Sequence, residues 1–376
     1  MPSFTSDERQ LLHDSLQDYF SSKYNFEHFR SISAAVDGDG FDRTAWAEYA
    51  ELGWLGVSLP EAAGGSSGGM TELGIVMAAA GGALALEPLL ATVVLSASAI
   101  ELAGTPTQHA ILGEIAGGRK ILSFCHGEPD AGFARHHVEA IARQDGANYI
   151  ITGQKSFALH ANAADELLIS ARLGSASGPV ALFMVGRGCE GLTVNTAPAL
   201  DGRRGGTVTL SDVTVDAGAR LGDSDDDQGA TIDSVLDRGV IAVCAEAAGA
   251  MAAVTEQTVE YLKSREQFGQ PLSKFQVLQH RLVEMSIACE EVRATIHGAL
   301  KALDDAAPDA RRKIWQAKVQ TAKSGRFVGG QAIQLHGGMG MTDELAIGHY
   351  YKRISMAEAM FGDGDWYLEQ LSDNAA

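Results

Sequence analysis

QLHGGMG at Gln334–Gly340 and SREQFG at Ser264–Gly269 are the two stretches that decide the fold of this chain. Each follows a segment with helical character. Thr255–Ser264 leads into a Gly-Gln-Pro break, and a further helix is expected over 309–335. Taken alone, the glycines resemble an ordinary break at a helix C-terminus, and Arg265 resembles a solvated charge at a helix end. Their meaning therefore depends on the rest of the chain.

The chain on either side of these stretches changes its periodicity twice. From Thr231 onward the pattern is helical, and Phe275, Leu278 and Leu282 repeat on one helix face. Between residues 120 and 221, short apolar runs are separated by Gly, Asp and Asn, which predicts strands of a small sheet. The clearest runs are Tyr149–Thr152, Glu166–Ala171, Ala181–Val185 and Thr207–Leu210.

The first part of the chain is expected to be helical. Thr5 resembles an N-cap before acidic first-turn residues, and 42–55 is amphipathic. A Gly-rich loop covers 62–69, and an acidic linker covers 221–229. The order of helices, strands and helices predicts an α+β protein. Its domains are expected to be an all-α N-terminal domain (1–118), a central sheet domain (119–222) and a helical C-terminal domain (223–376).

Composition limits the possible partners. The 376 residues carry a formal net charge of −19, which argues against nucleic acid or an anionic membrane as a partner. No apolar run is long enough for a membrane span, the N-terminus does not resemble a signal peptide, and a cytoplasmic protein is expected. The four cysteines are widely spaced without a CxxC pair, so neither a metal site nor a disulfide framework is indicated.

Several stretches, taken in order, resemble the acyl-CoA dehydrogenase family. Besides the two C-terminal stretches, these are Leu59–Glu61 before the Gly-rich loop, Glu128–Gly132 and Gly153–Lys155. The resemblance implies an N-terminal helical domain, a central β-barrel and a C-terminal four-helix bundle. It also implies FAD bound between two subunits, an acyl-CoA substrate that undergoes α,β-dehydrogenation, and electron-transfer flavoprotein as the electron acceptor.

The resemblance assigns a set of residues to FAD. Arg265 would meet the pyrophosphate, because a guanidinium is always charged and forks onto phosphate. Gly337 and Gly338 would let the backbone approach the cofactor, since a Cβ there would collide. The other cofactor residues that the resemblance implies are Gln267, Phe268, Gln276, Gln334 and, stacking from the barrel, Phe157.

The catalytic base of the family is missing. The reaction needs a carboxylate to remove the α-proton, but the usual position holds Phe361, which is expected to wall the pocket. A second family position, on the first long helix of the bundle, holds Gly239. Glu246 and Asp363 are the candidate replacements. Each also has a structural interpretation, as an ion-pair partner and as a turn or capping acid.

The polar environment of the substrate and flavin is also altered. Asp237 matches a position where the family often has an Asp near the substrate. Where the family presents hydroxyls or stacking groups to the flavin, Gly127 and Leu159 offer no side-chain donor and Phe133 is bulky. The neighbouring histidines, His126 and His160, are either compensating donors or polar groups satisfied within the fold.

The two halves of the expected FAD site therefore disagree. Residues donated to a neighbour's flavin are present, and those that hold a chain's own flavin are eroded. The leading hypothesis is a subunit that completes the FAD site of a partner in an α2β2 heterotetramer acting on lipid, steroid or aromatic acyl-CoA. The alternatives are a homodimeric or homotetrameric enzyme with a relocated base, a non-catalytic acyl-CoA-binding scaffold, and a flavin monooxygenase.

Overall fold

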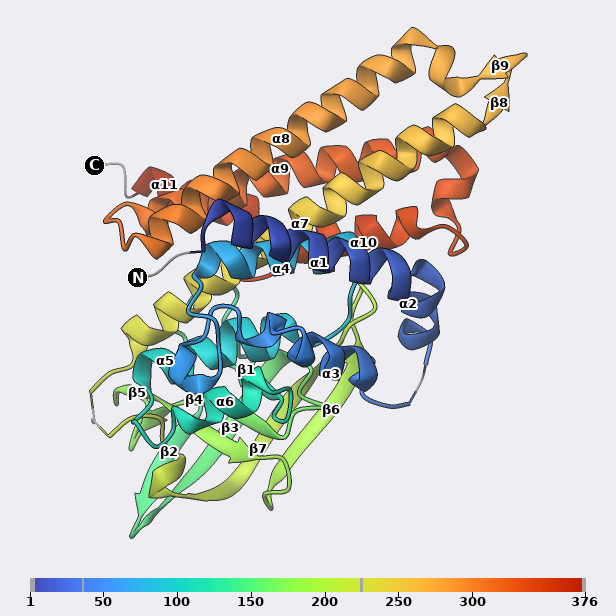
Figure 1. The fold of residues 1–376 in the computed structure, drawn as a ribbon. Coiled ribbons are helices and arrows are strands. Elements are labelled where there is room, and N and C mark those ends of the chain that lie inside the picture. Colours follow the sequence, from blue (N-terminus) through green and yellow to red (C-terminus); the bar gives the residue numbers. More distant parts are fainter. Residues whose placement is uncertain (1–3, 36, 224–225, 374–376) are drawn as a thin grey trace. The chain divides into compact units, whose positions relative to one another are not determined.

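The computed structural model describes residues 4–35, 37–223 and 226–373, so positions 224 and 225 of the expected linker lie outside the described residues. Contacts divide the chain into two compact units. The first comprises Ile32–Gly68 and Leu86–Gly239, and the second comprises Pro2–Ser31, Gly69–Ala85 and Val240–Ala376. Figure 1 follows the chain through both. The three domain ranges drawn from the sequence stay a prediction.

The helices of the first unit are short. Asp42 begins the first of them as an N-cap, accepting a hydrogen bond from Thr44 N at 2.8 Å. A π-helical segment precedes the sheet, and the hydroxyl of Thr92 within it donates to Leu122 O at 2.8 Å. The elements are α3 (Arg43–Glu51), η1 (Trp54–Gly56), η2 (Glu61–Ala63), η3 (Leu89–Ser96), α5 (Ala97–Ala103), α6 (Ala110–Ala116) and η4 (Ala217–Ala219).

A seven-stranded sheet forms the centre of the first unit, in the order β1-β4-β2-β3-β7-β6, with β5 paired to β4. β4 runs parallel to β1 and β2, and the remaining pairs are antiparallel. All four expected strand runs lie in strands. The bounds are β1 (Leu122–Cys125), β2 (Ile141–Asp145), β3 (Asn148–Leu159), β4 (Glu166–Leu173), β5 (Val180–Gly186), β6 (Leu192–Pro198) and β7 (Arg204–Asp216).

Strand β3 is irregular near Phe157, one of the residues assigned to FAD. Its register against β7 shifts between Ile151 and Gly153, and again between Lys155 and Ala158. The second shift contains Phe157, whose φ of 49° is rare outside glycine. A β-bulge of this kind redirects a side chain, and Phe157 is 47% exposed.

The second unit is helical. Thr5 and Glu8 form a capping box at the start of its first helix, as the sequence predicts. α8 and α9 lie side by side (Figure 1), and α10 and α11 also pack on α9. The elements are α1 (Ser6–Lys23), α4 (Met70–Gly82), α7 (Gly229–Ser264), β8 (Glu266–Gln267), β9 (Gln270–Pro271), η5 (Leu272–Lys274), α8 (Gln276–Asp304), α9 (Ala310–His336), η6 (Gly337–Met341), α10 (Ala346–Ala359) and α11 (Gly364–Asp373); α2 (Phe26–Ser33) and α7 each span the boundary between the units.

Helix α7 is, among the described residues, the one helix long and apolar enough to cross a membrane by length and composition. Within that window, 72% of the residues are buried inside the protein, as in the core helix of a bundle. α4 crosses α7 closely, because a Cβ on Gly81 would lie 2.0 Å from Glu246 O and one on Gly249 would lie 1.8 Å from Ala78 O. Glycine permits this close backbone contact.

Candidate functional site

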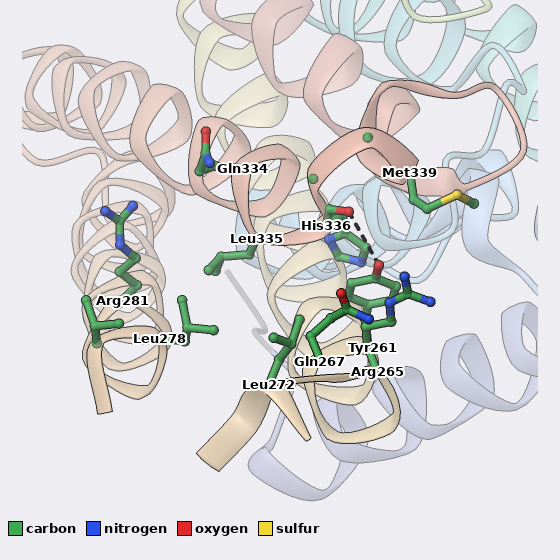
Figure 2. Close-up of a pocket in the computed structure, with 13 residues that line it drawn as sticks. Tyr261, Arg265, Gln267, Leu272, Leu278, Arg281, Gln334, Leu335, His336 and Met339 are labelled. Carbon is green, nitrogen blue, oxygen red and sulfur yellow. Dashed lines mark hydrogen bonds between the residues drawn. The ribbon is translucent and has the colours of Figure 1, made fainter. Parts of the chain in front are cut away.

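A pocket of about 660 Å³ lies in the second unit, where the ends of three helices meet the β8–β9 hairpin (Figure 2). Five of the residues assigned to FAD line it together: Arg265, Gln267, Gln334, Gly337 and Gly338. Its other lining residues are Tyr261, Leu272, Val277, Leu278, Arg281, Leu335, His336 and Met339. No carboxylate is among them, although the chain has 48 acidic residues. The pocket is therefore suited to an anionic ligand.

Arg265 supplies the exposed positive charge. It follows the last residue of α7, and its backbone N–H donates to Tyr261 O at 2.8 Å. Within the described parts of the chain, its side chain makes no hydrogen bond or ion pair. Figure 2 places the guanidinium beside Tyr261 at one end of the pocket. An uncompensated guanidinium at a helix end is a ready phosphate ligand.

The turn after α9 brings bare backbone to the pocket. Gly337 has φ 60° and ψ −137°, a conformation that side chains disfavour. Built Cβ atoms on Gly337 and Gly338 meet nothing within 4 Å. The turn therefore depends on glycine at position 337 for its backbone, and the space over both residues is open to a ligand.

Three polar residues of the pocket, besides its apolar lining, were not predicted from the sequence. The rings of Tyr261 and His336 stack with centroids 4.2 Å apart. His336 Nδ1 donates to Ala332 O at 2.8 Å, and burial lowers the pKa of this histidine, which favours its neutral form. Arg281 donates to Gln331 Oε1 at 2.6 Å. Tyr261 could have been predicted, because its spacing from Arg265 places the two residues on one helix face.

Three other residues assigned to FAD lie outside the pocket lining: Gln276, Phe268 and, on β3 in the first unit, Phe157. Gln276 begins α8 and is exposed. Phe268, in the β8–β9 hairpin, is 90% exposed with φ 57°. Its ring makes an edge contact with Phe275 at 6.1 Å. An aromatic side chain with this exposure is suited to contact with another molecule.

Glu246 is held in a buried ion pair. Its carboxylate lies 2.8 Å from Nη1 of Arg353, with side-chain exposures of 4% and 0%. Arg353 also donates to Ala85 O at 3.0 Å. This geometry matches the structural interpretation of Glu246, because the carboxylate is buried and engaged with Arg353.

Asp363 performs a capping role. It directly precedes α11, and its carboxylate accepts a hydrogen bond from Trp366 N at 2.8 Å. Phe361 lies two residues earlier with φ 61°, and its carbonyl accepts from the hydroxyl of Tyr367 at 2.8 Å. The carboxylate nearest in sequence to the expected base position is thus part of the turn.

Asp237, the expected substrate-side acid, lies in the first unit and is 5% exposed. Nη1 of Arg135 is 2.7 Å from its carboxylate and 3.8 Å from that of Asp233. The pair ties the segment before β2 to α7. Its role toward a substrate stays a prediction.

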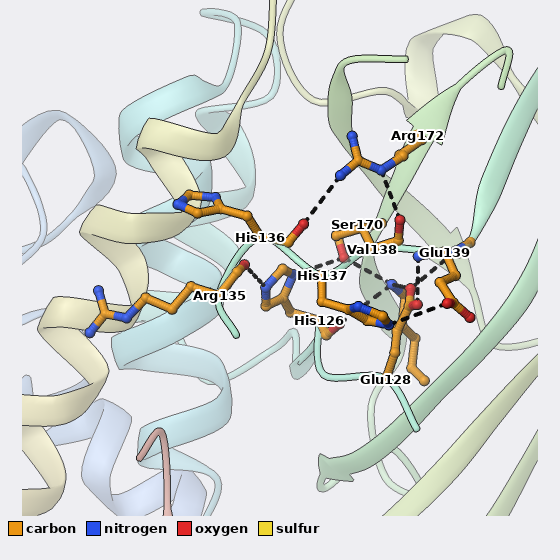
Figure 3. Close-up of polar contacts among 11 residues, drawn as sticks. His126, Glu128, Arg135, His136, His137, Val138, Glu139, Ser170 and Arg172 are labelled. Atoms are coloured by element: carbon orange, nitrogen blue, oxygen red, sulfur yellow. Dashed lines mark hydrogen bonds and ion pairs between the residues drawn. The ribbon is translucent and has the colours of Figure 1, made fainter. Parts of the chain in front are cut away.

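The two histidines beside the expected flavin face each make hydrogen bonds within the fold. His126 Nε2 donates to Arg135 O at 2.8 Å, which leaves Nδ1 to accept from Ser170 Oγ at 2.9 Å (Figure 3). Burial and the nearby Lys155 lower the pKa of His126 to about 4. His160 is 1% exposed and donates to Leu86 O at 2.9 Å.

Lys155 and Glu128 form a buried ion pair beneath His126. Their charged atoms are 2.5 Å apart, and Lys155 also donates to Ser170 Oγ at 3.0 Å. Burial raises the pKa of Glu128, but Lys155 and two backbone N–H groups outweigh it and hold that pKa below its usual range. Ligand atoms of Glu128, His137 and Glu139 lie within 4.8 Å of one another, but Glu128 is already neutralised by Lys155.

The other altered flavin-side positions are occupied by apolar or backbone contacts. Gly127 O accepts from Ser156 N at 2.8 Å, and Leu159 is buried. Phe133 is 37% exposed. The ring of Phe157 covers Gly205, where a Cβ would lie 3.1 Å from it. None of these four residues presents a side-chain hydrogen-bond donor.

The chain belongs to the acyl-CoA dehydrogenase family. Residues 6–119 match the model of the acyl-CoA dehydrogenase N-terminal domain, and residues 228–375 match that of the C-terminal domain. The expected fold, with an N-terminal helical domain, a central curled sheet and a C-terminal helical domain, is confirmed. Members are flavin-dependent oxidoreductases, which confirms the expected class of enzyme.

Individual relatives resemble the chain over almost its full length. The acyl-CoA dehydrogenase FadE12 of Mycobacterium tuberculosis is 31% identical, covering 91% of this chain and 89% of that protein. A variant of the Tcur3481-Tcur3483 steroid ACAD is 29% identical, with a TM-score of 0.87 over 98% of this chain and 97% of that one. The ChsE4-ChsE5 complex from Mycobacterium tuberculosis contains a chain 25% identical, with a TM-score of 0.88 over 99% and 98%.

Proposed function

We propose that this chain is one subunit of a heteromeric, FAD-dependent acyl-CoA dehydrogenase and that its Arg265 pocket completes the FAD site of a partner subunit. The contrast within the chain carries the proposal. The pocket that suits a diphosphate is intact, with an uncompensated guanidinium, two open glycines and no lining carboxylate. Of the two candidate bases, Glu246 forms a buried ion pair and Asp363 caps a helix.

The pocket residues suit the diphosphate half of FAD. Arg265 would hold the phosphate charge, Gln334 would donate hydrogen bonds, and the Gly337–Gly338 backbone would allow close approach. FAD, when bound, would accept a hydride from the β-carbon of the acyl thioester. The proton from the α-carbon needs a carboxylate, and we assign that group to the partner.

Exposed apolar side chains around the pocket support a partner at this end of the second unit. They come from the elements that build the pocket: the β8–β9 hairpin, α8 and η6. Exposed apolar groups gathered in this way mark association surfaces. The residues are Phe268 (90% exposed), Met341 (77%), Val277 (62%), Val283 (57%), Ile287 (54%) and Met339 (39%).

The substrate class follows from similarity. Of two similar structures, one is named a steroid ACAD with two components and the other a complex of two chains. We extend an α2β2 assembly and a bulky, steroid-derived acyl-CoA to this chain, with electron-transfer flavoprotein as the acceptor. The segments that would bind CoA itself need local positive charge, because the chain as a whole carries −19.

The test measures FAD retained per chain, first in this protein alone and then in the complex co-purified with its catalytic partner. We expect little FAD in the protein alone and bound FAD in the complex. Arg265→Gln should reduce FAD retention in the complex, whereas Arg293→Gln, at an exposed position on α8, should not. A homo-oligomer of this chain with one tightly bound FAD per chain and acyl-CoA turnover would overturn the proposal.

A further inference from the structure

Lys318 is a buried cation that the proposed chemistry does not use. It lies on α9 and is 1% exposed. Its ammonium donates to two backbone carbonyls, Ala357 O at 2.5 Å and Met360 O at 2.8 Å. Across the described ranges, it forms no ion pair with a carboxylate. A buried ammonium needs some other compensation for its lost hydration.

The end of α10 provides that compensation. α10 ends at Ala359, so Ala357 O and Met360 O lie where intrahelical donors run out. These carbonyls carry the negative end of the helix dipole, which favours a cation. The ammonium therefore satisfies two carbonyls and takes its stabilisation from them.

The backbone directly after these carbonyls is strained and clamped. Phe361 has φ 61° and Gly362 has φ 117°. The hydroxyl of Tyr367 donates to Phe361 O at 2.8 Å, and Asp363 caps α11 through Trp366 N. A non-glycine residue keeps a positive φ only where surrounding contacts hold it there. Lys318 supplies the contact on the α10 side of this turn.

We propose that Lys318 is a positioning residue that fixes the turn Met360–Asp363 and so sets the direction in which Phe361 is presented. The consequence for an acyl-CoA pocket rests on the proposed function, in which Phe361 walls that pocket. Removing the ammonium takes from Ala357 O and Met360 O the donor that Lys318 supplies, and the turn loses this contact with α9.

The surroundings of Lys318 give the proposal a pH signature. Burial lowers the pKa of Lys318 to about 8, partly offset by Cys244 on α7, Glu358 on α10 and Asp363 in the turn. Glu358 is itself 3.1 Å from Arg326. A neutral amine keeps two N–H donors, so both hydrogen bonds remain possible above pH 8. Opening the turn returns the amine to water, where its pKa rises toward 10.5, so between these values the open turn binds the extra proton and opening becomes rarer as the pH rises.

The experiment is hydrogen exchange of the segment 357–367, compared between wild type, Lys318→Met and the matched control Lys323→Met. Lys323 is exposed on the same helix. We expect exchange in this segment to be faster by about tenfold in Lys318→Met only. In wild type, the exchange rate, corrected for its intrinsic pH dependence, should fall as the pH rises above 8, and this step should be absent in Lys318→Met.

Two results would overturn the proposal: unchanged exchange in 357–367, or equal acceleration over the whole chain, which would make Lys318 a general stabiliser. If Lys318→Met does not fold, two other measurements still decide the proposal. They are the pH dependence of exchange in wild type and the exchange of 357–367 in Tyr367→Phe, which lacks the hydrogen bond to Phe361 O on the α11 side of the turn. FAD retention in the complex is read separately, so failure of the proposed function leaves this result standing.

Discussion

The carboxylate of Glu246 lies 2.8 Å from the guanidinium of Arg353 inside the helical unit, and neither side chain reaches solvent appreciably. The pair joins α7 to α10, and Arg353 also bonds Ala85 O at the end of the α4 segment. A buried ion pair contributes little net stability, but removing one member leaves an uncompensated charge. Glu246 is thus part of a contact among three segments of the unit. Its substitution is therefore expected to change the stability of the fold first.

We expect Glu246→Ala to lower the free energy of unfolding by about 3–5 kcal/mol, because the buried charge of Arg353 would lose its carboxylate partner. Glu246→Gln should cost less, since its amide oxygen can still accept a hydrogen bond. Urea unfolding measures both. Glu260→Ala, on the exposed face of the same helix, is the control. Wild-type stability of Glu246→Gln in a complex that has lost turnover with FAD retained would instead identify Glu246 as a base.

Asp363 allows a second distinction between capping and catalysis. Asp363→Ala should cost about 1 kcal/mol of unfolding free energy, because Trp366 N loses its acceptor, and Asp363→Asn should be nearly neutral. Glu369→Ala, exposed within α11, is the matched control. Thermal unfolding gives the stabilities. Abolished turnover in a normally stable Asp363→Asn complex would contradict the capping role.

Local signals in the sequence predicted much of the fold. Thr5 and Glu8 are three residues apart, and their capping box forms as expected. The four apolar runs between residues 120 and 221 lie in strands, because a short apolar run bounded by Gly, Asp or Asn is a signal that a single stretch of sequence carries. Five pocket residues could be predicted as a group because they lie in the two stretches, 264–269 and 334–340, that resemble those of the acyl-CoA dehydrogenase family.

Relationships between distant residues were not predictable. Glu246 and Arg353 are 107 positions apart, so nothing near Glu246 identifies its partner. His126 depends on Ser170, 44 positions away, in the same manner. Phe157 lies at a β-bulge that only the pairing of β3 with β7 reveals. Tertiary contact, rather than local preference, decides which polar residues are free to do chemistry.

Lys318 should make stability depend on alkaline pH. Its pKa falls from 10.5 to about 8 on folding, so between these values the unfolded chain binds the extra proton. The stability of wild type relative to Lys318→Met should therefore rise with pH over this window, by up to ~1.4 kcal/mol per pH unit. Urea unfolding at a series of pH values measures the slope. A flat difference between pH 8 and 10.5 would show that the ammonium is not buried.

His126 should make stability depend on acid pH in the corresponding way. Its ring accepts from Ser170 and donates to Arg135 O, so a proton added to Nδ1 would destroy the bond it accepts and place a second cation near Lys155. The pKa falls from 6.5 to about 4 on folding, so the unfolded chain binds the proton first as the pH drops. The stabilising contribution is complete above pH 6.5 and is lost progressively down to pH 4.

The measurement compares wild type with His126→Gln, which cannot titrate. The stability advantage of wild type should shrink by about 3 kcal/mol between pH 7 and 4, following 1.4 kcal/mol for each unit of pKa shift. His13→Gln, exposed on α1, controls for the loss of a surface histidine and should leave the wild-type slope intact. If the unfolding free energies of wild type and His126→Gln change in parallel over this pH range, His126 is accessible to protons in the folded protein. The face of the sheet beside Gly127 would then be accessible as well.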